Sequence, residues 1–215
     1  SSFCTTYPSE LNLKKKNAVY YIPNPADISF ETLECYKNKN QINDLFFAMS
    51  HGVHRGILKR GKFDKRSIFI QNLKDKNPNL KFDLYGLDNK QPIWSDDYKL
   101  ALSKSKMALN LSQGKPSKYY SSDRIAQLVA NGILTFVDNQ TKLKKLFTTN
   151  EVVFYNSLND LTKKINFYLN NRTLRNKIAK NGKKKYLKYL NSSIVADFII
   201  KKTMNFKHKK KYLWE

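Results

Sequence analysis

The 215-residue sequence has few of the residues that build disulfide frameworks, metal centres or membrane spans. It has two cysteines, which give no disulfide framework and suit a reducing compartment. Three histidines and no Cys-x-x-Cys pair leave no four ligands at zinc-binding spacing, so we expect no metal. No apolar run approaches the ~20 residues of a membrane span, and no signal-peptide pattern opens the chain. We therefore expect a cytoplasmic protein. The start without Met is consistent with a piece of a longer one.

Acidic residues are also scarce. There are 17 Asp and Glu against 40 Lys and Arg, a formal net charge of +23. Such a balance suits a polyanionic partner: nucleic acid, an anionic membrane surface or a phosphorylated substrate. Residues 171–215 carry 14 of these cations, and a basic end of that kind can sit on anionic lipid headgroups. A lysine-rich surface also follows from simple compositional bias, and the charge alone does not decide between bias and a polyanionic partner.

Short apolar runs alternate with amphipathic segments from residue 18 onward. This alternation predicts parallel strands joined by right-handed crossovers, with helices on both faces. The expected fold class is therefore α/β, with a doubly wound, Rossmann-like parallel sheet. We expect strands at 18–22, 45–49, 81–85, 106–112, 133–137 and 151–155. We expect helices at 67–73, 96–105, 123–131, 142–147, 158–169 and 174–190, and a weak helical tendency over 29–43.

Ligands of an open parallel sheet bind outside the carboxyl ends of its strands, which draws attention to the loop 52–62. Gly52 would let the backbone approach a ligand closely. Arg55, Lys59 and Arg60 could neutralise a diphosphate, Arg as a planar bidentate donor and Lys as a point charge. The loop matches neither a Walker A nor a GxGxxG pattern. A solvated basic loop is the alternative.

A second candidate is the start of the helix predicted at 123–131. Ser121, Ser122 or Asp123 could each be its N-cap, and its exposed N–H groups would form a phosphate site. Arg124 would place a cation in the first turn, where the helix dipole disfavours it, and such exceptions are expected mainly at functional sites. The alternative is an ordinary capped helix with a surface arginine.

Two further features are open to either a functional or a structural interpretation. His51 and His54 are candidate acid–base groups, although two loop histidines without a visible partner are more often structural. Trp94 follows Pro92 and either packs a loop or stacks on a base or sugar.

The order of these segments resembles the C-terminal domain of GT-B glycosyltransferases, of the group 1 type and its spore-coat relatives. The resemblance covers roughly residues 18–200. It is carried by YYIPNPAD (20–27), the basic glycine loop, LYG (84–86), QLVANG (127–132) and the stretch 168–186. It implies a nucleotide-sugar-binding domain at 18–200. Residues 1–17 would then be a linker or the end of a preceding domain, and 201–215 a basic tail.

The resemblance also implies roles for individual residues. Many members have two glutamates eight residues apart, the second of which binds ribose hydroxyls; Tyr119 and Gln127 occupy these positions here. Gln127 can still hydrogen-bond a hydroxyl but brings no charge. Arg55, Arg60 and Arg124 would stabilise the leaving diphosphate. The implied donor-binding residues are Gly52, Arg55, Lys59, Arg60, Gly86, Ser121, Ser122, Asp123, Arg124 and Gln127.

The implied activity is transfer of a sugar from a nucleotide diphosphate sugar to a hydroxyl, in surface glycan synthesis, without metal or other cofactor. The acceptor would be a carbohydrate, a lipid-linked molecule or a protein, with peripheral contact to an anionic membrane and no nucleic-acid partner. The alternative is a basic α/β domain that binds nucleic acid or anionic membrane without catalysis. Glycines at the ends of strands favour a small-ligand cleft.

Overall fold

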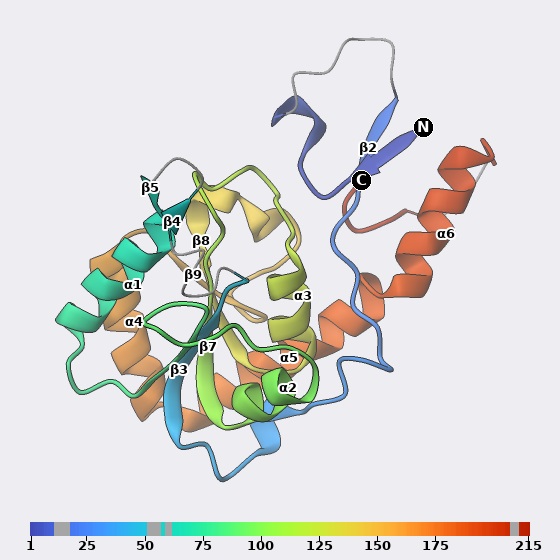
Figure 1. Ribbon diagram of the computed structural model, residues 1–215. Helices are drawn as coiled ribbons and strands as arrows, with labels where there is room; N and C mark the ends of the chain where they lie inside the picture. Colours follow the sequence, from blue (N-terminus) through green and yellow to red (C-terminus); the bar gives the residue numbers. More distant parts are fainter. Residues whose placement is uncertain (11–17, 51–56, 59–61, 207–210) are drawn as a thin grey trace.

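Five parallel strands form the centre of the computed structural model, which describes residues 1–10, 18–50, 57–58, 62–206 and 211–215. They follow the order β6-β3-β7-β8-β9 across the sheet. The predicted α/β class with a doubly wound parallel sheet is confirmed (Figure 1). The strands are β3 (Asn43–Ala48), β6 (Phe82–Tyr85), β7 (Ser105–Asn110), β8 (Leu134–Asp138) and β9 (Val153–Tyr155).

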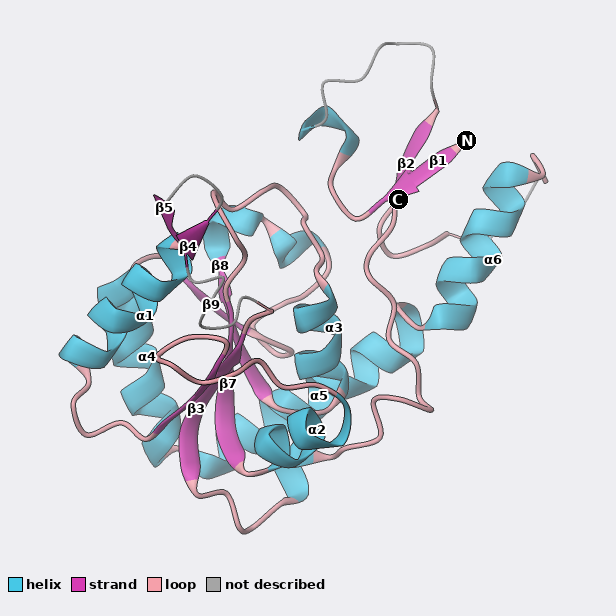
Figure 2. Cartoon of the chain, in the orientation of Figure 1, coloured by secondary structure: helices cyan, strands magenta, loops and turns pink. Residues whose placement is uncertain are grey.

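Helices cover both faces of this sheet because its strands are apolar on both sides (Figure 2). In β3, Leu45 and Phe47 join one core cluster, whereas Phe46 joins the cluster of the opposite face. The first face carries α1 (Lys65–Lys76) and α4 (Leu158–Asn170), and the second carries α2 (Ser95–Ser103) and α3 (Asp123–Ala130). The long helix α5 (Arg172–Tyr189) packs against α3 and β8.

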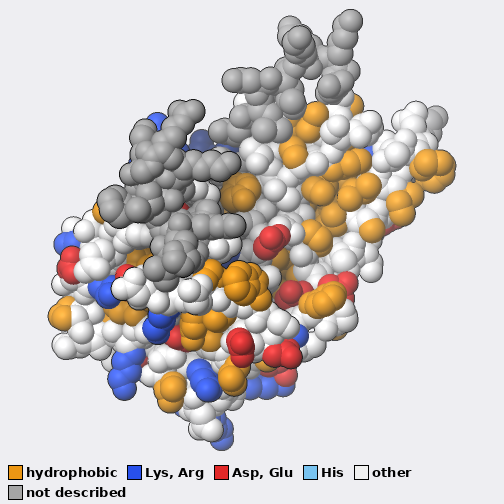
Figure 3. Space-filling model, viewed as in Figure 1, with side chains coloured by type: hydrophobic (Ala, Val, Ile, Leu, Met, Phe, Trp, Pro, Cys, Tyr) orange, Lys and Arg blue, Asp and Glu red, His pale blue; other side chains and the backbone are white. Residues whose placement is uncertain are grey.

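The amino-terminal segment forms a small sheet of its own. The strand predicted at 18–22 exists as β2 (Val19–Tyr21), but it pairs in parallel with β1 (Ser2–Cys4) and lies outside the five-stranded sheet. Phe3 of β1 packs edge-on against Phe198 of α6 (Ser192–Thr203), and Trp214 near the carboxyl end packs on the same ring. Phe198 and Trp214 belong to a buried hydrophobic cluster, and further hydrophobic side chains are visible on the surface of this part of the molecule (Figure 3).

Two helical predictions are wrong. Residues 142–147 do not form an α-helix. Two single 3₁₀ turns, at Asn139–Thr141 and Leu143–Lys145, lie on either side of Lys142, whose left-handed φ of 54° interrupts the helical path. Within 29–43, only Cys35–Lys37 forms a 3₁₀ turn. Hydrogen bonds to α3 and α5, described below, hold the rest of that segment in an irregular path. None of the helices described combines the length and apolar character that crossing a bilayer requires.

Candidate functional site

A cavity of about 890 Å³ opens where β3 and β7 end and α3 begins. Its walls combine residues 48–50 after β3, residues 93–95 before α2, residues 112–113 after β7 and residues 120–127 around the start of α3. This is the carboxyl edge of the parallel sheet, where connections diverge to opposite faces and leave a crevice. The fold therefore places this cavity where ligands of such sheets bind.

The start of α3 faces this cavity without a side-chain cap. Ser122 is the N-cap residue, but its side chain bonds no first-turn amide, and its Oγ is buried with no hydrogen-bond partner among the described residues. Asp64, Ser157 and Asn191 cap α1, α4 and α6, whereas α2 and α5 begin, like α3, without a side-chain cap. Ser121 is fixed differently, since its Oγ accepts the N–H of Asn24 at 2.9 Å. The free amides and the positive end of the helix dipole suit an anion.

Arg124 lies at the back of the cavity and joins two strands. Its Nε donates to the carbonyl of Ala48 at 3.0 Å, and its Nη1 donates to that of Leu111 at 2.7 Å. The guanidinium also lies 5.1 Å from the centre of the Phe47 ring. These acceptors explain how a cation is tolerated in the first turn of a helix. The alternative of a surface arginine does not hold.

The charge of Arg124 has no carboxylate partner within the described part of the chain. Burial lowers the pKa of Arg124 to about 10, and the neighbouring Arg66 contributes to the lowering. The group is thus still cationic at neutral pH. A half-buried cation whose hydrogen bonds to the described residues go only to backbone carbonyls is stabilised further by a bound anion.

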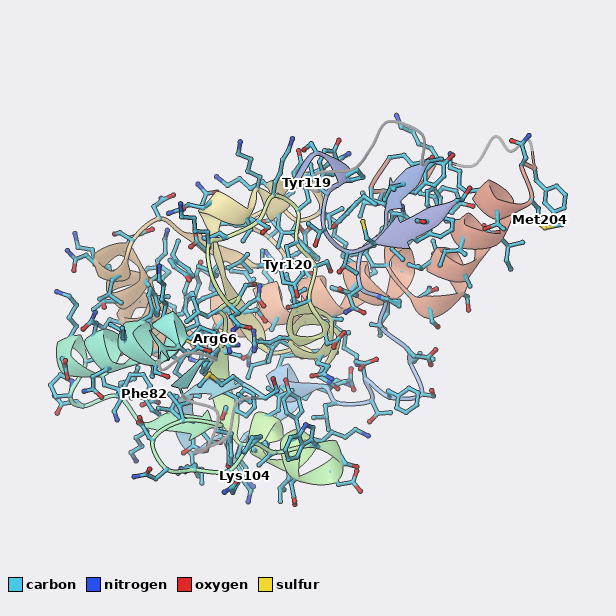
Figure 4. The ribbon with its side chains drawn as sticks, turned by 45° about the horizontal axis from the view of Figure 1, so that its top comes forward. Arg66, Phe82, Lys104, Tyr119, Tyr120 and Met204 are labelled. Carbon is cyan, nitrogen blue, oxygen red and sulfur yellow. The ribbon has the colours of Figure 1, made fainter. Side chains whose placement is uncertain are left out.

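Arg66 and Lys99 also bring positive charge to the cavity wall, and Arg66 is held rigidly. Its Nε lies 3.0 Å from Asp64 Oδ1, and its Nη2 lies 2.5 Å from Asp64 Oδ2. Asp64 is also the N-cap of α1, so this pair fixes the guanidinium to the start of the helix. Arg66 and Tyr120, which also lines the cavity, are labelled in Figure 4.

One end of the cavity is aromatic and polar. Phe30 and Trp94 stand at its rim and are 67% and 65% exposed, which is unusual for side chains of this size. Tyr98 lies deeper, and its hydroxyl is buried without a hydrogen-bond partner among the described residues. Gln127 and Asn131 line the same end from α3. Such a combination of flat apolar faces and polar groups suits a nucleoside.

Half of the predicted site residues meet in this cavity. Ser121, Ser122, Asp123, Arg124 and Gln127 all line it. Gly86 ends β6 with a left-handed φ of 78° but does not line it. Gly52, Arg55, Lys59 and Arg60, like His51 and His54, lie outside the described residues.

The structure adds residues that sequence reasoning did not select. Arg66 was missed because α1 begins at Lys65 and not at residue 67 as predicted; the observed start makes Asp64 the N-cap and places Arg66 within reach of its carboxylate. Glu31 and Tyr98 carried no such signal. Tyr119, at the first glutamate position of the resemblance, is not among the lining residues; its carbonyl accepts the hydroxyl of Tyr21 at 2.7 Å.

Solved structures share this architecture. Sucrose-phosphate synthase from Thermosynechococcus elongatus superposes over 90% of this chain with a TM-score of 0.60 and 12% identity. Alr3699/HepE from Anabaena in complex with UDP does so over 87%, with a TM-score of 0.59 and 12% identity. An alpha-glucosyltransferase in complex with UDP and a 13-mer DNA superposes over 94% of this chain, with a TM-score of 0.61 and 14% identity. The chain spans 54%, 58% and 63% of these structures.

The fold is therefore that of the C-terminal domain of GT-B glycosyltransferases, with its cavity at the carboxyl edge of the sheet. A family described as glycosyl transferase-like matches residues 65–201, from α1 to the end of α6. The chain belongs to this glycosyl transferase-like family. A search among curated proteins gave no match.

Proposed function

We propose that this chain is the donor-binding part of a glycosyltransferase that moves a sugar from a nucleotide diphosphate sugar to a hydroxyl acceptor. The observation that carries the proposal is Arg124, a cation without a carboxylate partner among the described residues, beside the uncapped start of α3. Membership of the glycosyl transferase-like family supports the same assignment.

In the proposed reaction, the bond between the sugar's anomeric carbon and the β-phosphate oxygen breaks, and the acceptor oxygen bonds to that carbon. The acceptor loses its proton, and the nucleoside diphosphate leaves with an additional negative charge. Arg124 and the first amides of α3 would stabilise that charge, because they are already oriented toward the cavity. Protein groups thus supply the positive charge in this proposal, without a metal.

The acceptor and the setting are also proposals. Because the chain spans little more than half of the solved structures it resembles, we expect the acceptor to bind partly outside these 215 residues. The chain alone should then bind the donor without transferring sugar. We propose a carbohydrate, lipid-linked or protein acceptor in surface glycan synthesis, on the cytoplasmic side. The basic residues 171–215 would favour contact with anionic lipid.

The test is a thermal-shift panel with UDP, GDP, ADP and CDP and their sugar conjugates. A ligand that binds only the folded chain raises the melting temperature by mass action. We expect one of these nucleotides to stabilise the wild type and to lose most of its effect in Arg124→Ala. A charged hydrogen bond contributes about 1.5–3 kcal/mol, so affinity should fall roughly 10- to 100-fold.

Arg175 provides a matched control. It is a buried arginine whose Nη1 lies 2.7 Å and 3.3 Å from the carbonyls of Tyr168 and Leu169, and it does not line the cavity. Arg175→Ala should therefore lower stability in a similar way while the response to nucleotide persists. Equal nucleotide affinity in the two variants would remove Arg124 from the site. Failure of every nucleotide to stabilise the wild type would overturn the proposed function.

A further inference from the structure

The segment between β2 and β3 runs along α3 and forms one wall of the cavity. It is fixed at the start of the helix by the Asn24 N–H, which donates to Ser121 Oγ at 2.9 Å. It is fixed at the other end by the Leu33 N–H, which donates to Asn131 Oδ1 at 3.0 Å. Glu31 lies two residues before Leu33. Its backbone therefore lies beside the last turn of α3.

Lys183 of α5 fixes the backbone of the β2–β3 segment near Glu31. Its ammonium donates to the carbonyls of Glu31 at 2.9 Å, Leu33 at 2.7 Å and Ala130 at 2.9 Å. The segment and the end of α3 thus share one anchor. Because both sides of the wall are tied to the same ammonium, the Glu31 side chain enters the cavity from a defined backbone.

The Glu31 carboxylate is only partly satisfied by the protein. Its Oε2 accepts the N–H of Asp27 at 2.6 Å, and no Lys or Arg of the described residues forms an ion pair with it. Burial raises the pKa of Glu31, and this effect outweighs the lowering by the nearby Lys183 ammonium, which bonds the Glu31 carbonyl and not its carboxylate. Nearby, the Tyr98 hydroxyl is buried and also unpartnered among the described residues. Both residues line the cavity.

The spacing of α3 indicates which part of the ligand meets Glu31. Arg124, Gln127 and Asn131 line the cavity from one face of the helix. Gln127 lies about 4.5 Å further along the axis than Arg124, at 1.5 Å per residue. A nucleoside diphosphate with its phosphates at Arg124 therefore places its ribose near Gln127 and the wall that carries Glu31.

We propose that Glu31 binds the ribose hydroxyls of the donor together with Gln127, supplying from the β2–β3 segment the carboxylate that position 127 of α3 lacks. This inference rests on the proposed function, because it takes the cavity to hold a nucleotide sugar. A carboxylate accepts hydrogen bonds from the 2′- and 3′-hydroxyls, and Gln127 adds an uncharged donor and acceptor.

The experiment measures binding to the 215-residue chain by isothermal titration calorimetry. The probes are UDP, GDP, ADP and CDP, followed by the 2′,3′-dideoxy form of whichever binds. Glu31→Gln keeps an oxygen for the Asp27 N–H while removing the charge. Glu34→Gln is the control, because Glu34 is an exposed acidic residue of the same segment, pairs with Lys37 and does not line the cavity.

We expect Glu31→Gln to weaken binding of the ribonucleotide by about tenfold or more, the range of a charge-assisted hydrogen bond. Binding of the dideoxynucleotide should be unchanged or tighter, because losing a negative charge favours a diphosphate. This difference between the two nucleotides separates a ribose contact from a general electrostatic effect. Glu34→Gln should change neither affinity, and circular dichroism should show that all the variants are folded.

Equal weakening of ribonucleotide and dideoxynucleotide binding in Glu31→Gln would overturn the inference, as would no change in either. Both results leave the proposed function intact, since the wild type still binds a nucleotide. Glu31→Ala, which removes the oxygens altogether, should show the same discrimination between the two nucleotides. A wild-type chain that binds none of the four diphosphates would overturn the proposed function together with this inference.

Discussion

Replacing Lys183 with methionine tests how the cavity wall is held. Methionine preserves most of the length and apolar character of the lysine stem but has no donor. The substitution leaves the carbonyls of Glu31, Leu33 and Ala130 without their shared ammonium. The carbonyl of Ala130 belongs to the last turn of α3, where backbone acceptors lack partners within the helix.

The size of the effect follows from these three hydrogen bonds. Bonds from a charged donor contribute about 1.5–3 kcal/mol each in buried settings. Lys183 is only half-buried, and burial lowers its pKa, so its own desolvation offsets part of the gain. About 1 kcal/mol per bond is therefore a reasonable value, or about 3 kcal/mol in all. For a chain of this length we expect a drop in melting temperature of roughly 6–12 °C.

The assay is urea unfolding followed by circular dichroism, with thermal unfolding as a second measurement. Lys184→Met is the matched control, since Lys184 is the next residue of α5 and is exposed. It should change the free energy of unfolding by less than about 0.5 kcal/mol. If Lys183→Met and Lys184→Met proved equally stable, the three hydrogen bonds would not hold the wall, and the argument that places Glu31 in the cavity would lose its anchor.

Two further substitutions test the packing behind the site and its response to acid. In Gly182→Ala, alanine favours the helix by about 1 kcal/mol, but its Cβ would lie 2.5 Å from the carbonyl oxygen of Glu151. We expect the clash to dominate and to lower the free energy of urea unfolding by about 1–2 kcal/mol; a more stable variant would contradict this close approach. Hydrogen bonds from Ser192 and Ser29 lower the pKa of Asp27 from 3.8 to about 2. The contribution of Asp27 to the free energy of unfolding is therefore present above the unfolded pKa and is lost as the pH falls toward 2. Asp27→Asn should therefore melt below the wild type at neutral pH and converge with it on acidification, whereas a constant difference would refute the linkage.

Much of the fold could be predicted because it depends on local pattern. The continuous apolar run at 45–49 indicates a strand buried on both faces, and β3 packs into two core clusters. Gly132 directly follows the helix predicted at 123–131, where a glycine typically adopts a left-handed conformation, and its φ is 72°. The start of α3 was selected in the same way, from a serine pair and an arginine in the wrong part of a helix.

Contacts between residues that are distant in the sequence could not be predicted from any local pattern. The run at 18–22 has the composition of a strand, but only the folded chain shows that it pairs with β1. The acceptors of Arg124 lie 76 and 13 residues away, and only the neighbouring ends of β3 and β7 bring them to one guanidinium.

The sequence by itself thus determined which segments are strands and helices, since spacing and composition decide backbone conformation and the face that is buried. It also determined that an anion site was plausible at Ser121–Arg124. Only the tertiary structure decided what Arg124 binds and that a segment expected to be weakly helical carries Glu31 into the same cavity. The physical reason is that long-range packing chooses which buried polar groups meet, and residues such as Glu31 and Lys183, 152 positions apart, are paired by that packing alone.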